Sequence, residues 1–317
     1  MSKVKTMRDA LISGIYERMA VDERLYFLSA DFGAPMLDNL RAKYSKRFVN
    51  VGIAEQNLIG ISAGLATEGY IPFAYAIAPF ITMRAYEQRR NNLSLLSHHR
   101  QLNVNLVGVG AGVSYDVSGP THHCLEDLIV MRTLPNIYIC SPSDWVIASK
   151  FLDYAIEIPC PKYIRLDSKP IAALYDENSE IDFRKGFHVF SRGKELCLIT
   201  TGFITHTAKQ VVKRLSEEGK NIGLIDVFML RPLNSQALIN ELREYKHIIT
   251  AEEGFIDKGG LDSLISSILL TAGVNVRFGR MGFGDSFVFN LGDRKHLHAI
   301  NGLDEESMIK KVYEALS

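Results

Sequence analysis

The chain has 317 residues, with 47% hydrophobic content and 36 basic residues that balance 36 acidic ones. This length and hydrophobic content suffice for two domains with substantial cores, and a formal net charge of +0 excludes an overall field that would recruit nucleic acid or an anionic membrane. The four cysteines include no Cys-x-x-Cys pair, which argues against a zinc site or a disulfide framework, and there is neither an apolar signal region nor an apolar run of about 18 residues, so we expect a cytoplasmic protein.

In the first half of the chain, apolar β-runs alternate with helical patterns. The β-runs cover residues 25–28, 48–51, 71–75, 102–109, 137–140 and 163–166. The helical patterns lie near 54–68, 80–97, 124–133 and 144–157. This alternation predicts an α/β domain over 1–166, with a mostly parallel, doubly wound sheet covered by helices on both faces.

The alternation is lost between Asp167 and Arg192, where Pro, Asn and charged residues collect, and we interpret 167–192 as a linker. A second doubly wound α/β domain is predicted over 193–317. Its expected strands are 196–200, 222–228, 248–251 and 274–278, and its expected helices are 205–218, one from about Asn234, one after Gly260, and 304–316. Cys140 and Cys197 lie in apolar runs and are expected to be buried thiols.

One carboxylate, Glu55, lies where an apolar β-run gives way to a helix. Apolar residues recur there at helical spacing, and Gly60 and Gly64 are expected to allow close packing. Glu55 therefore falls in the first turn, half dehydrated, where loss of water favours a protonated carboxyl that can share its proton with a ring nitrogen of a ligand. The plainer interpretation, favoured by spacing alone, is a first-turn carboxylate that complements the helix dipole.

The segment Gly52-Ile53-Ala54-Glu55-Gln56-Asn57 resembles the core motif of the pyrimidine-binding domain of transketolases, which are thiamine diphosphate enzymes. The supporting stretches are Ser29-Ala30-Asp31, Arg84-Ala85-Tyr86-Glu87-Gln88, Gly119-Pro120-Thr121-His122, Leu134-Pro135-Asn136, Ala251-Glu252-Glu253 and Gly259-Gly260-Leu261. Each stretch is weak alone, but their order and spacing together are highly specific. The resemblance runs from about Met7 to the C-terminus, matches the C-terminal two-thirds of a full-length transketolase, and is closest to the separate small subunit of split transketolases.

This resemblance implies that the chain encodes half of an active site. In the family, the cofactor diphosphate is held through a divalent cation, Mg²⁺, whose ligands come from a Gly-Asp-Gly segment and a later Asn in a separate N-terminal domain. This sequence has no Gly-Asp-Gly, and its pairs Gly284-Asp285 and Gly292-Asp293 lie near the C-terminus, outside that context. Because a plausible first helix follows Met1 directly, we expect a naturally short chain. We assign it no metal ligand.

The expected partner is therefore an N-terminal transketolase subunit that carries the diphosphate-binding domain and supplies the Mg²⁺ ligands. Each cofactor should lie between a pyrimidine domain of this chain and a diphosphate domain of the partner. Two such sites related by symmetry suggest a heterotetramer. The C-terminal domain of this chain is expected to pack and assemble the complex.

By resemblance, Glu55 hydrogen-bonds the pyrimidine ring nitrogen and favours the imino tautomer, so that the exocyclic nitrogen removes the thiazolium C2 proton. Phe80, Met83 and Tyr86 match three aromatic positions that pack around the pyrimidine; Met83 departs from the aromatic, although a thioether is a tolerable substitute against a ring. Asp31 is expected near the cofactor at a strand end. The plainer alternatives stay open: core packing for Phe80 and Met83, a helix surface for Tyr86, and an N-cap or turn for Asp31.

His122 is the second catalytic candidate, because an imidazole that titrates near neutral pH suits proton transfer to and from substrate hydroxyls. It matches the histidine of the family's Gly-Pro-Thr-His segment, whereas His123 does not. On sequence alone, either histidine fits a satisfied loop residue, and His123 keeps that interpretation.

Three positions depart from the family pattern where substrate is contacted. Ser118 replaces an Asp that contacts a substrate hydroxyl, Gly110 replaces a histidine that contacts sugar phosphate, and Ser168 replaces an arginine, with Lys169 beside it. A serine cannot offer a phosphate the bidentate fork of a guanidinium. The acceptor pocket is therefore expected to be reshaped: either the substrate lacks the usual terminal phosphate, or the partner or Lys169 binds it differently. Ser118, His122 and Lys169 are the candidate substrate residues.

Taken with the resemblance, these residues imply the small subunit of a two-component transketolase-like enzyme that transfers a two-carbon ketol unit between sugars, with a non-standard acceptor. One alternative is a thiamine-dependent acyl transferase subunit with a 2-oxo acid donor, but Gly-Pro-Thr-His and Arg-Ala-Tyr-Glu-Gln favour ketol transfer. Another is a non-catalytic assembly subunit, against which the intact Glu55 and His122 argue. The run Glu252-Glu253-Gly254-Phe255 lacks the histidine often found after the acidic pair in relatives, and we assign it no chemistry.

Overall fold

The computed structural model describes residues 3–317, which form two compact units. The N-terminal unit contains the chain up to Ala111 and again from Val130 to Ile181. The C-terminal unit contains Gly112–Ile129 and Asp182–Ser317. The segment that holds His122 therefore belongs to the same unit as the C-terminal half of the chain.

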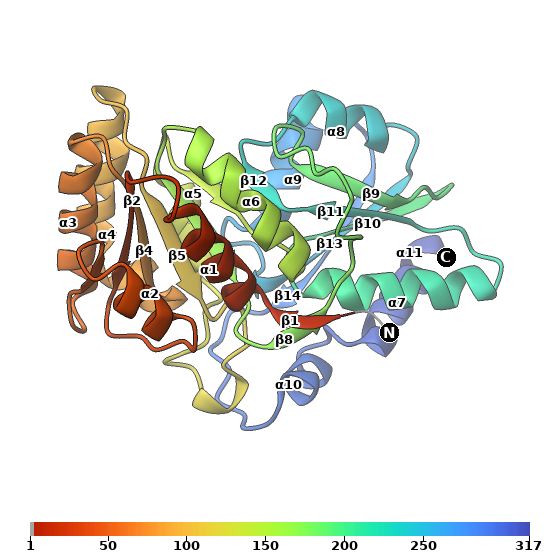
Figure 1. Ribbon diagram of the computed structural model, residues 1–317. Coiled ribbons are helices and arrows are strands. Elements are labelled where there is room, and N and C mark those ends of the chain that lie inside the picture. Colours follow the sequence, from red (N-terminus) through yellow and green to blue (C-terminus); the bar gives the residue numbers. More distant parts are fainter. Residues whose placement is uncertain (1–2) are drawn as a thin grey trace. The chain divides into compact units, whose positions relative to one another are not determined.

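Six parallel strands form the sheet of the N-terminal unit, in the order β6-β7-β5-β4-β2-β3, of which β5, β4 and β2 are labelled in Figure 1. They are β2 (Leu25–Ser29), β3 (Phe48–Asn50), β4 (Ile71–Ile77), β5 (Asn105–Val109), β6 (Tyr138–Cys140) and β7 (Lys162–Leu166). Strands β5 and β7 are buried at every residue, as expected for central parallel strands covered on both faces. The predicted parallel α/β architecture is thus confirmed.

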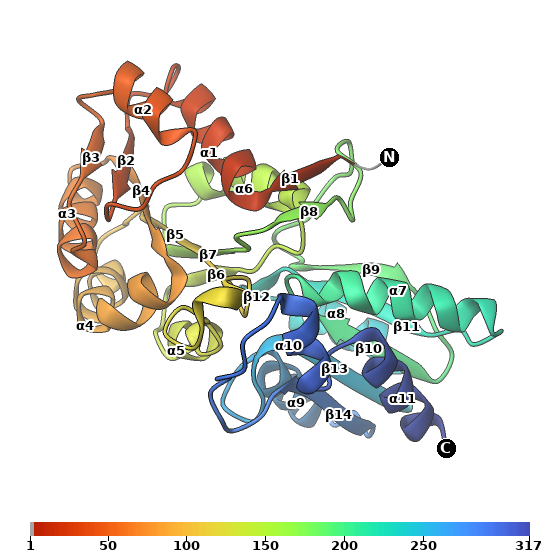
Figure 2. The same cartoon turned by 90° about the horizontal axis from the view of Figure 1, so that it is seen from below.

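The helices of this unit lie on both faces of its sheet, with α1 beside α6 on one face and α3 with α4 on the other (Figure 2). Their bounds are α1 (Met7–Arg18), α2 (Leu37–Lys43), α3 (Glu55–Thr67), α4 (Tyr86–Gln88), α5 (Asp127–Arg132), in which the chain returns to this unit, and α6 (Trp145–Glu157). Side-chain caps fix the first turns of the α1–α6 pair: Thr6 accepts from the Asp9 N–H, and Asp144 accepts from the Ile147 N–H.

The segment predicted as a helix over 80–97 is helical, but it is not one regular α-helix. The segment instead consists of two π-helical stretches, η1 (Phe80–Arg84) and η2 (Arg89–Leu95), on either side of the short α4, followed by the 3₁₀ turn η3 (Leu96–His98). One physical reason is Thr82, whose hydroxyl donates to the Ala78 carbonyl at 2.6 Å and so competes with regular helical bonding. Apolar spacing does not reveal such a break.

Two other boundaries differ from the prediction. The expected helix over 124–133 begins only at Asp127, because Cys124 exchanges backbone hydrogen bonds with Gly112 and is extended. The expected linker over 167–192 contains β8 (Pro170–Ala172), which pairs antiparallel with β1 (Val4–Thr6), and β9 (Phe187–Ser191).

The C-terminal unit has a five-stranded sheet in the order β14-β13-β10-β11-β9, in which only β9 is antiparallel. Its strands are β9, β10 (Leu196–Thr200), β11 (Gly223–Val227), β13 (His247–Phe255) and β14 (Arg277–Phe283), and the short β12 (Met229–Arg231) belongs to the same unit. The last strand lies further along the chain than the predicted 274–278. Cys197 is buried in β10 and Cys140 in β6, which confirms the prediction for both thiols.

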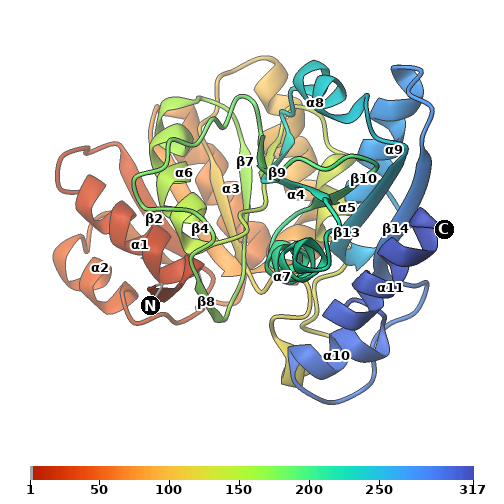
Figure 3. The ribbon, with the colours of Figure 1, turned by 90° about the vertical axis from the view of Figure 1, so that its right-hand side faces the viewer.

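Helices cover both faces of this second sheet, and Figure 3 shows α7 and α11 side by side on one of them. The helices are α7 (Ile204–Glu217), α8 (Ser235–Leu242), α9 (Leu261–Thr271), α10 (Arg294–Ile300) and α11 (Glu305–Leu316), with a 3₁₀ turn, η4 (Asp116–Ser118), in the inserted segment. Apolar residues of α7, α10 and α11 form one core cluster, and those of α8 and α9 form a second. The sequence did not predict α10. Within residues 3–317, no helix is both long and apolar enough to cross a membrane.

Candidate functional site

Glu55 is the first residue of α3, where the chain turns out of β3 at Gly52 with φ +74°. The residue is 2% exposed, so it is more fully buried than the half dehydration expected from the sequence. The Glu55 carboxylate accepts a hydrogen bond from Arg84, with Nη1 and Oε2 2.6 Å apart. The sequence had not predicted this contact with a cation.

Arg84 also connects Glu55 to Phe80. The guanidinium carbon of Arg84 lies 4.6 Å from the centroid of the Phe80 ring, so a flat, N–H-bearing group rests over this ring while it donates to Glu55. Phe80 and Arg84 are the two ends of η1, whose geometry brings both toward the start of α3. The sequence motif contains Arg84, but no pattern in it singled out this arginine as a site residue.

Met83 and Tyr86 lie differently from Phe80. Met83 is 37% exposed. The Tyr86 hydroxyl shares a hydrogen bond with the Thr133 hydroxyl at 2.9 Å, and the guanidinium of Arg89 lies 5.3 Å from the Tyr86 ring. Because the segment breaks between η1 and α4, these residues do not follow one regular helix. The structure links Phe80 to Glu55 and ties Tyr86 to Thr133.

One face of α3 is open. A Cβ atom added to Gly60 or Gly64 would have nothing within 4 Å, so the close packing expected at these glycines does not occur among residues 3–317. Ile53, two residues before Glu55, is 73% exposed. Ile53, Gly60 and Gly64 therefore face solvent.

Asp31 follows β2 in a left-handed conformation, with φ +52°. Its carboxylate accepts from the Asn50 amide at 2.8 Å, which links the ends of β2 and β3. Asp31 lines a cavity of about 510 Å³ in the N-terminal unit, and Arg8 and Arg41 contribute to the same lining. No sequence motif had pointed to Arg8 or Arg41.

Ser118 and His122 belong to the C-terminal unit and lie in a loop that we call the substrate loop, residues 112–124. Ser118 is exposed at the end of η4, and Gly119 turns the chain with φ +77°. The His122 ring is half-buried; its Nδ1 lies 3.0 Å from the Thr121 hydroxyl, and its ring meets the Tyr115 ring edge-on at 6.5 Å.

The neighbouring His123 points inward. It is 4% exposed, and its Nε2 lies 3.2 Å from the backbone oxygen of Asp116. Asp116 is 5% exposed, and each of its carboxylate oxygens accepts a backbone hydrogen bond: one from the Val117 N–H at 2.9 Å and the other from the Arg294 N–H at 3.1 Å.

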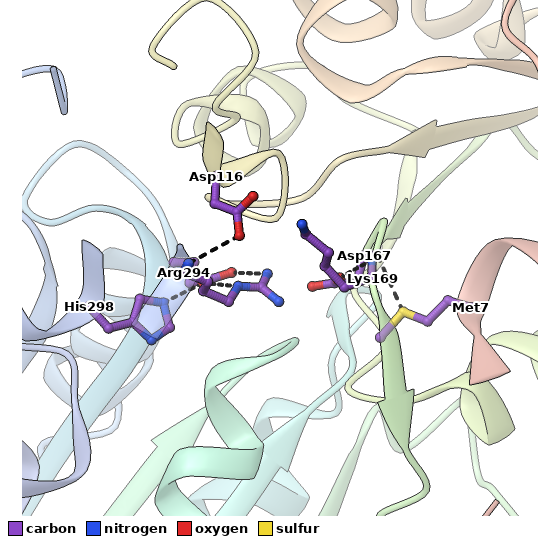
Figure 4. Close-up of polar contacts among 7 residues, drawn as sticks. Met7, Asp116, Asp167, Lys169, Arg294 and His298 are labelled. Atoms are coloured by element: carbon purple, nitrogen blue, oxygen red, sulfur yellow. Dashed lines mark hydrogen bonds and ion pairs between the residues drawn. The ribbon is translucent and has the colours of Figure 1, made fainter. Parts of the chain in front are cut away.

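Lys169 lies just beyond β7 in the N-terminal unit. Its backbone N–H donates to the Asp167 carboxylate at 2.8 Å, while the lysine itself is exposed (Figure 4). Asp167 is 2% exposed, and its own N–H points to the sulfur of Met7 at 3.4 Å. The backbone at Lys169 is thus fixed, while Ser168 beside it is half-buried.

The acidic pair on β13 carries more interactions than the sequence indicated. Glu253 is buried against Arg294 and His298, which lie in α10 (Figure 4). Burial alone raises the pKa of Glu253, but the Arg294 guanidinium and the hydrogen bond from His298 outweigh this effect and lower its pKa to about 2. These partners lie more than 40 residues away in sequence, and no local pattern points to them.

No group of three or more His, Cys, Asp or Glu side chains within residues 3–317 could hold a metal ion. Among residues 3–317, the candidate site residues therefore include the Glu55 carboxylate, the Phe80 ring and the His122 imidazole, and no cluster of metal ligands.

Comparisons with known proteins identify the family. Residues 3–170 match the transketolase pyrimidine-binding domain, and residues 187–308 match the transketolase C-terminal domain. One of the subunits of the apulose-4-phosphate transketolase of Actinobacillus succinogenes is 33% identical over 268 residues, which cover 84% of this chain and 84% of the relative. The 6-deoxy-6-sulfo-D-fructose transketolase subunit SqwH of Clostridium sp. (strain MSTE9) is 27% identical over 97% of this chain and 94% of its own length.

Among solved structures, a split-gene transketolase in an inactive beta4 tetramer has a TM-score of 0.87 and 29% identity, and the match covers 98% of both chains. Together these matches confirm the resemblance found in the sequence. The chain therefore belongs to the transketolase family, of which it carries the pyrimidine-binding domain and the C-terminal domain.

Proposed function

We propose that this chain is the small subunit of a two-component transketolase, which transfers a two-carbon ketol unit between sugars together with an N-terminal subunit. Membership of the family implies dependence on thiamine diphosphate. Both relatives are transketolase subunits that align with this chain over most of their length, and the structural neighbour is a split-gene transketolase, which supports a two-component enzyme.

The observation that carries the proposal is the arrangement of Glu55, Arg84 and Phe80. A planar group that bears N–H donors already lies over the Phe80 ring and donates to the buried Glu55 carboxylate. An aminopyrimidine is also planar and bears nitrogen atoms at its edge, so the residues present fit this part of the cofactor. They would hold it by stacking on Phe80 and by a hydrogen bond to Glu55, with Met83 next to the ring.

The cofactor, when bound, supplies the carbanion chemistry of ketol transfer. The part of this chain is to bind, orient and move protons. Glu55 would share a proton with the pyrimidine ring nitrogen and so set its tautomer. His122, half-buried in the substrate loop, would exchange protons with the substrate hydroxyls, and the exposed Ser118 of the same loop would contact a substrate hydroxyl.

The partner subunit is proposed to bring the diphosphate-binding domain and the ligands for Mg²⁺. The open face of α3 supports this division, since the exposed Gly60 and Gly64 leave room for another chain. Two cofactor sites shared in this way suggest a heterotetramer.

The substrates are proposed to be non-standard sugars. The relatives are named for apulose 4-phosphate and for 6-deoxy-6-sulfo-D-fructose, which each carry an anionic group. In this chain, Gly110, Ser118 and Ser168 lack the side chains expected for an ordinary pentose phosphate. The exposed Lys169 is the candidate cation for an anionic sugar terminus.

A reconstitution assay tests the proposal. This chain is mixed with the N-terminal subunit, thiamine diphosphate and Mg²⁺, and ketol transfer from a panel of ketose donors to aldoses is followed by mass spectrometry. A two-carbon shift that needs both chains is the expected result. Turnover of 2-oxo acids with loss of CO₂, and none of ketoses, would favour the acyl transferase instead. Absence of both reactions despite cofactor binding would favour an assembly role.

A further inference from the structure

Four buried polar side chains of the C-terminal unit form a group that we call the Arg294 cluster: Asp116, Glu253, Arg294 and His298. Figure 4 labels Asp116, Arg294 and His298 of this cluster. Nε and Nη2 of Arg294 each lie 2.8 Å from one oxygen of the Glu253 carboxylate, which is a bidentate fork. Nε2 of His298 lies 2.5 Å from Oε1 of the same carboxylate. The guanidinium carbon also lies 3.7 Å from the centroid of the Phe203 ring. Arg294 is thus held in one orientation.

The Arg294 cluster holds the substrate loop at two points. The backbone N–H of Arg294 donates to the Asp116 carboxylate at 3.1 Å. At the start of the loop, a Cβ atom added to Gly112 would lie 2.2 Å from Oε2 of Glu253, so the loop backbone rests directly against this carboxylate. Only glycine fits there, because φ is +57° and the space is filled.

Ser118 and His122 lie between the two anchored parts of this loop. Asp116 precedes them, and His123 follows them and bonds back to the Asp116 backbone oxygen at 3.2 Å. At the far end, Cys124 exchanges two backbone hydrogen bonds with Gly112, at 2.8 and 3.1 Å. The candidate substrate residues are therefore carried by a closed loop whose base is the Glu253 carboxylate.

We propose that Glu253 and Arg294 are positioning residues for ketol transfer: they hold the substrate loop, through Gly112 and Asp116, so that His122 and Ser118 meet the substrate. This inference rests on the proposed function of the chain. It assigns Glu253 of β13 a role in substrate handling that is independent of the cofactor. The presence of a buried ion pair is in general weak evidence that the pair stabilises the fold. A buried pair does hold its two side chains in one well-defined geometry, which suits a positioning role. A displacement of about 1 Å in a reacting group can cost about 100-fold in rate.

The test uses Glu253→Gln in the reconstituted two-subunit complex. This change keeps the size of the side chain but removes the charge that pairs with Arg294. We expect kcat/KM for the sugar substrate to fall by about 10-fold to 100-fold. Thiamine diphosphate affinity and thiamine C2 hydrogen–deuterium exchange should stay within about twofold of wild type, because these depend on Glu55. Amide exchange in residues 112–124 should become faster, and amide exchange in α3 should not.

Glu252→Gln is the matched control. Glu252 is the neighbour of Glu253 on β13 and is equally buried, and its carboxylate accepts from the Asp262 N–H at the start of α9, at 3.0 Å. Loss of this charge should leave amide exchange of the substrate loop as in wild type.

Asp116→Asn is the second test variant, for the case that Glu253→Gln does not fold. It keeps the Glu253–Arg294 pair and weakens only the link to the loop. Asp116→Asn should also lower kcat/KM for the sugar substrate and leave cofactor affinity unchanged.

The proposal is overturned if Glu253→Gln or Asp116→Asn folds and shows wild-type kcat/KM together with wild-type exchange in residues 112–124. It is also overturned if cofactor affinity and kcat/KM fall in parallel, because that indicates a general structural defect. Failure of the proposed function looks different: the wild-type complex then has no ketol transfer at all, while the effect of Glu253→Gln on loop exchange remains measurable.

Discussion

Arg84 and Glu55 form an ion pair at the start of α3, with Nη1 and Oε2 2.6 Å apart, and the same guanidinium lies over the Phe80 ring. The side chain of Arg84 is 40% exposed and that of Glu55 only 3%, so the Glu55 carboxylate contacts the arginine and has little contact with solvent. A ligand that is to reach Glu55 while it stacks on Phe80 must therefore take the place of this guanidinium.

The first prediction concerns Arg84. In the reconstituted complex, Arg84→Met should bind thiamine diphosphate more tightly, by about fivefold, because a partly exposed ion pair that contributes about 1 kcal/mol no longer competes with the cofactor. Calorimetric titration measures this affinity. Arg90→Met is the control and should bind as wild type, since Arg90 is an exposed arginine of the same segment whose guanidinium donates to Asn91. Weaker binding by Arg84→Met would show that the arginine supports the bound cofactor.

The second prediction concerns Glu55. Glu55→Gln should fold normally, because Arg84 is exposed enough to turn toward water, but thiamine C2 hydrogen–deuterium exchange in the complex should slow by at least about 100-fold. Quenched-flow exchange followed by NMR measures the rate. Wild-type exchange in a folded Glu55→Gln complex would remove Glu55 from the mechanism.

The third prediction concerns sugar specificity. Each charge-assisted contact missing at Gly110, Ser118 and Ser168 contributes about 1.5–3 kcal/mol where present, so xylulose 5-phosphate and ribose 5-phosphate should be poor substrates. An unphosphorylated or otherwise modified sugar should be turned over better than the two pentose phosphates. Ser168→Arg should reduce this difference in kcat/KM between the two kinds of sugar. Steady-state kinetics decide between the outcomes. A specificity constant of about 10⁴ M⁻¹s⁻¹ or more for the two pentose phosphates would contradict this prediction and indicate a role in ordinary pentose phosphate metabolism.

The fourth prediction concerns pH. The pKa of Glu253 in the folded chain is about 2, below its ordinary value of 4.5, so the folded state favours the charged carboxylate. The resulting stabilisation, of about 3 kcal/mol, is present above about pH 4.5 and is lost as the pH falls toward 2. Urea unfolding from pH 6 to pH 3 should show this loss in wild type. Glu253→Gln should be less stable at pH 6 and should lack this part of the pH dependence. If the free energy of unfolding changes equally with pH in both proteins, the lowered pKa of Glu253 is contradicted.

The sequence predicted the features that depend on local patterns. The change from β-run to helical spacing located Glu55 at the start of α3, and apolar runs located the buried Cys140 and Cys197. It did not predict which cation would meet Glu55, since Arg84 lies 29 residues away in sequence. Charge pairs between distant segments are fixed by the tertiary fold, and their members have no spacing signal.

The same reason explains why the acidic pair of β13 was given no role. Glu253 is 41 residues from Arg294, and Arg294 is 178 residues from Asp116. The helical segment over 80–97 departs from a regular α-helix for a local reason. The Thr82 hydroxyl donates to a backbone carbonyl, which leaves the apolar pattern unchanged.

The most direct test of the central claim, that this chain holds one half of a shared cofactor site, is calorimetric titration of thiamine diphosphate with Mg²⁺ into the chain alone and into the reconstituted pair. We predict no tight binding by the chain alone and micromolar or tighter binding by the pair, at one cofactor for each copy of this chain. Micromolar, Mg²⁺-dependent binding by the isolated chain would contradict the claim, because the cofactor site would then be complete within it.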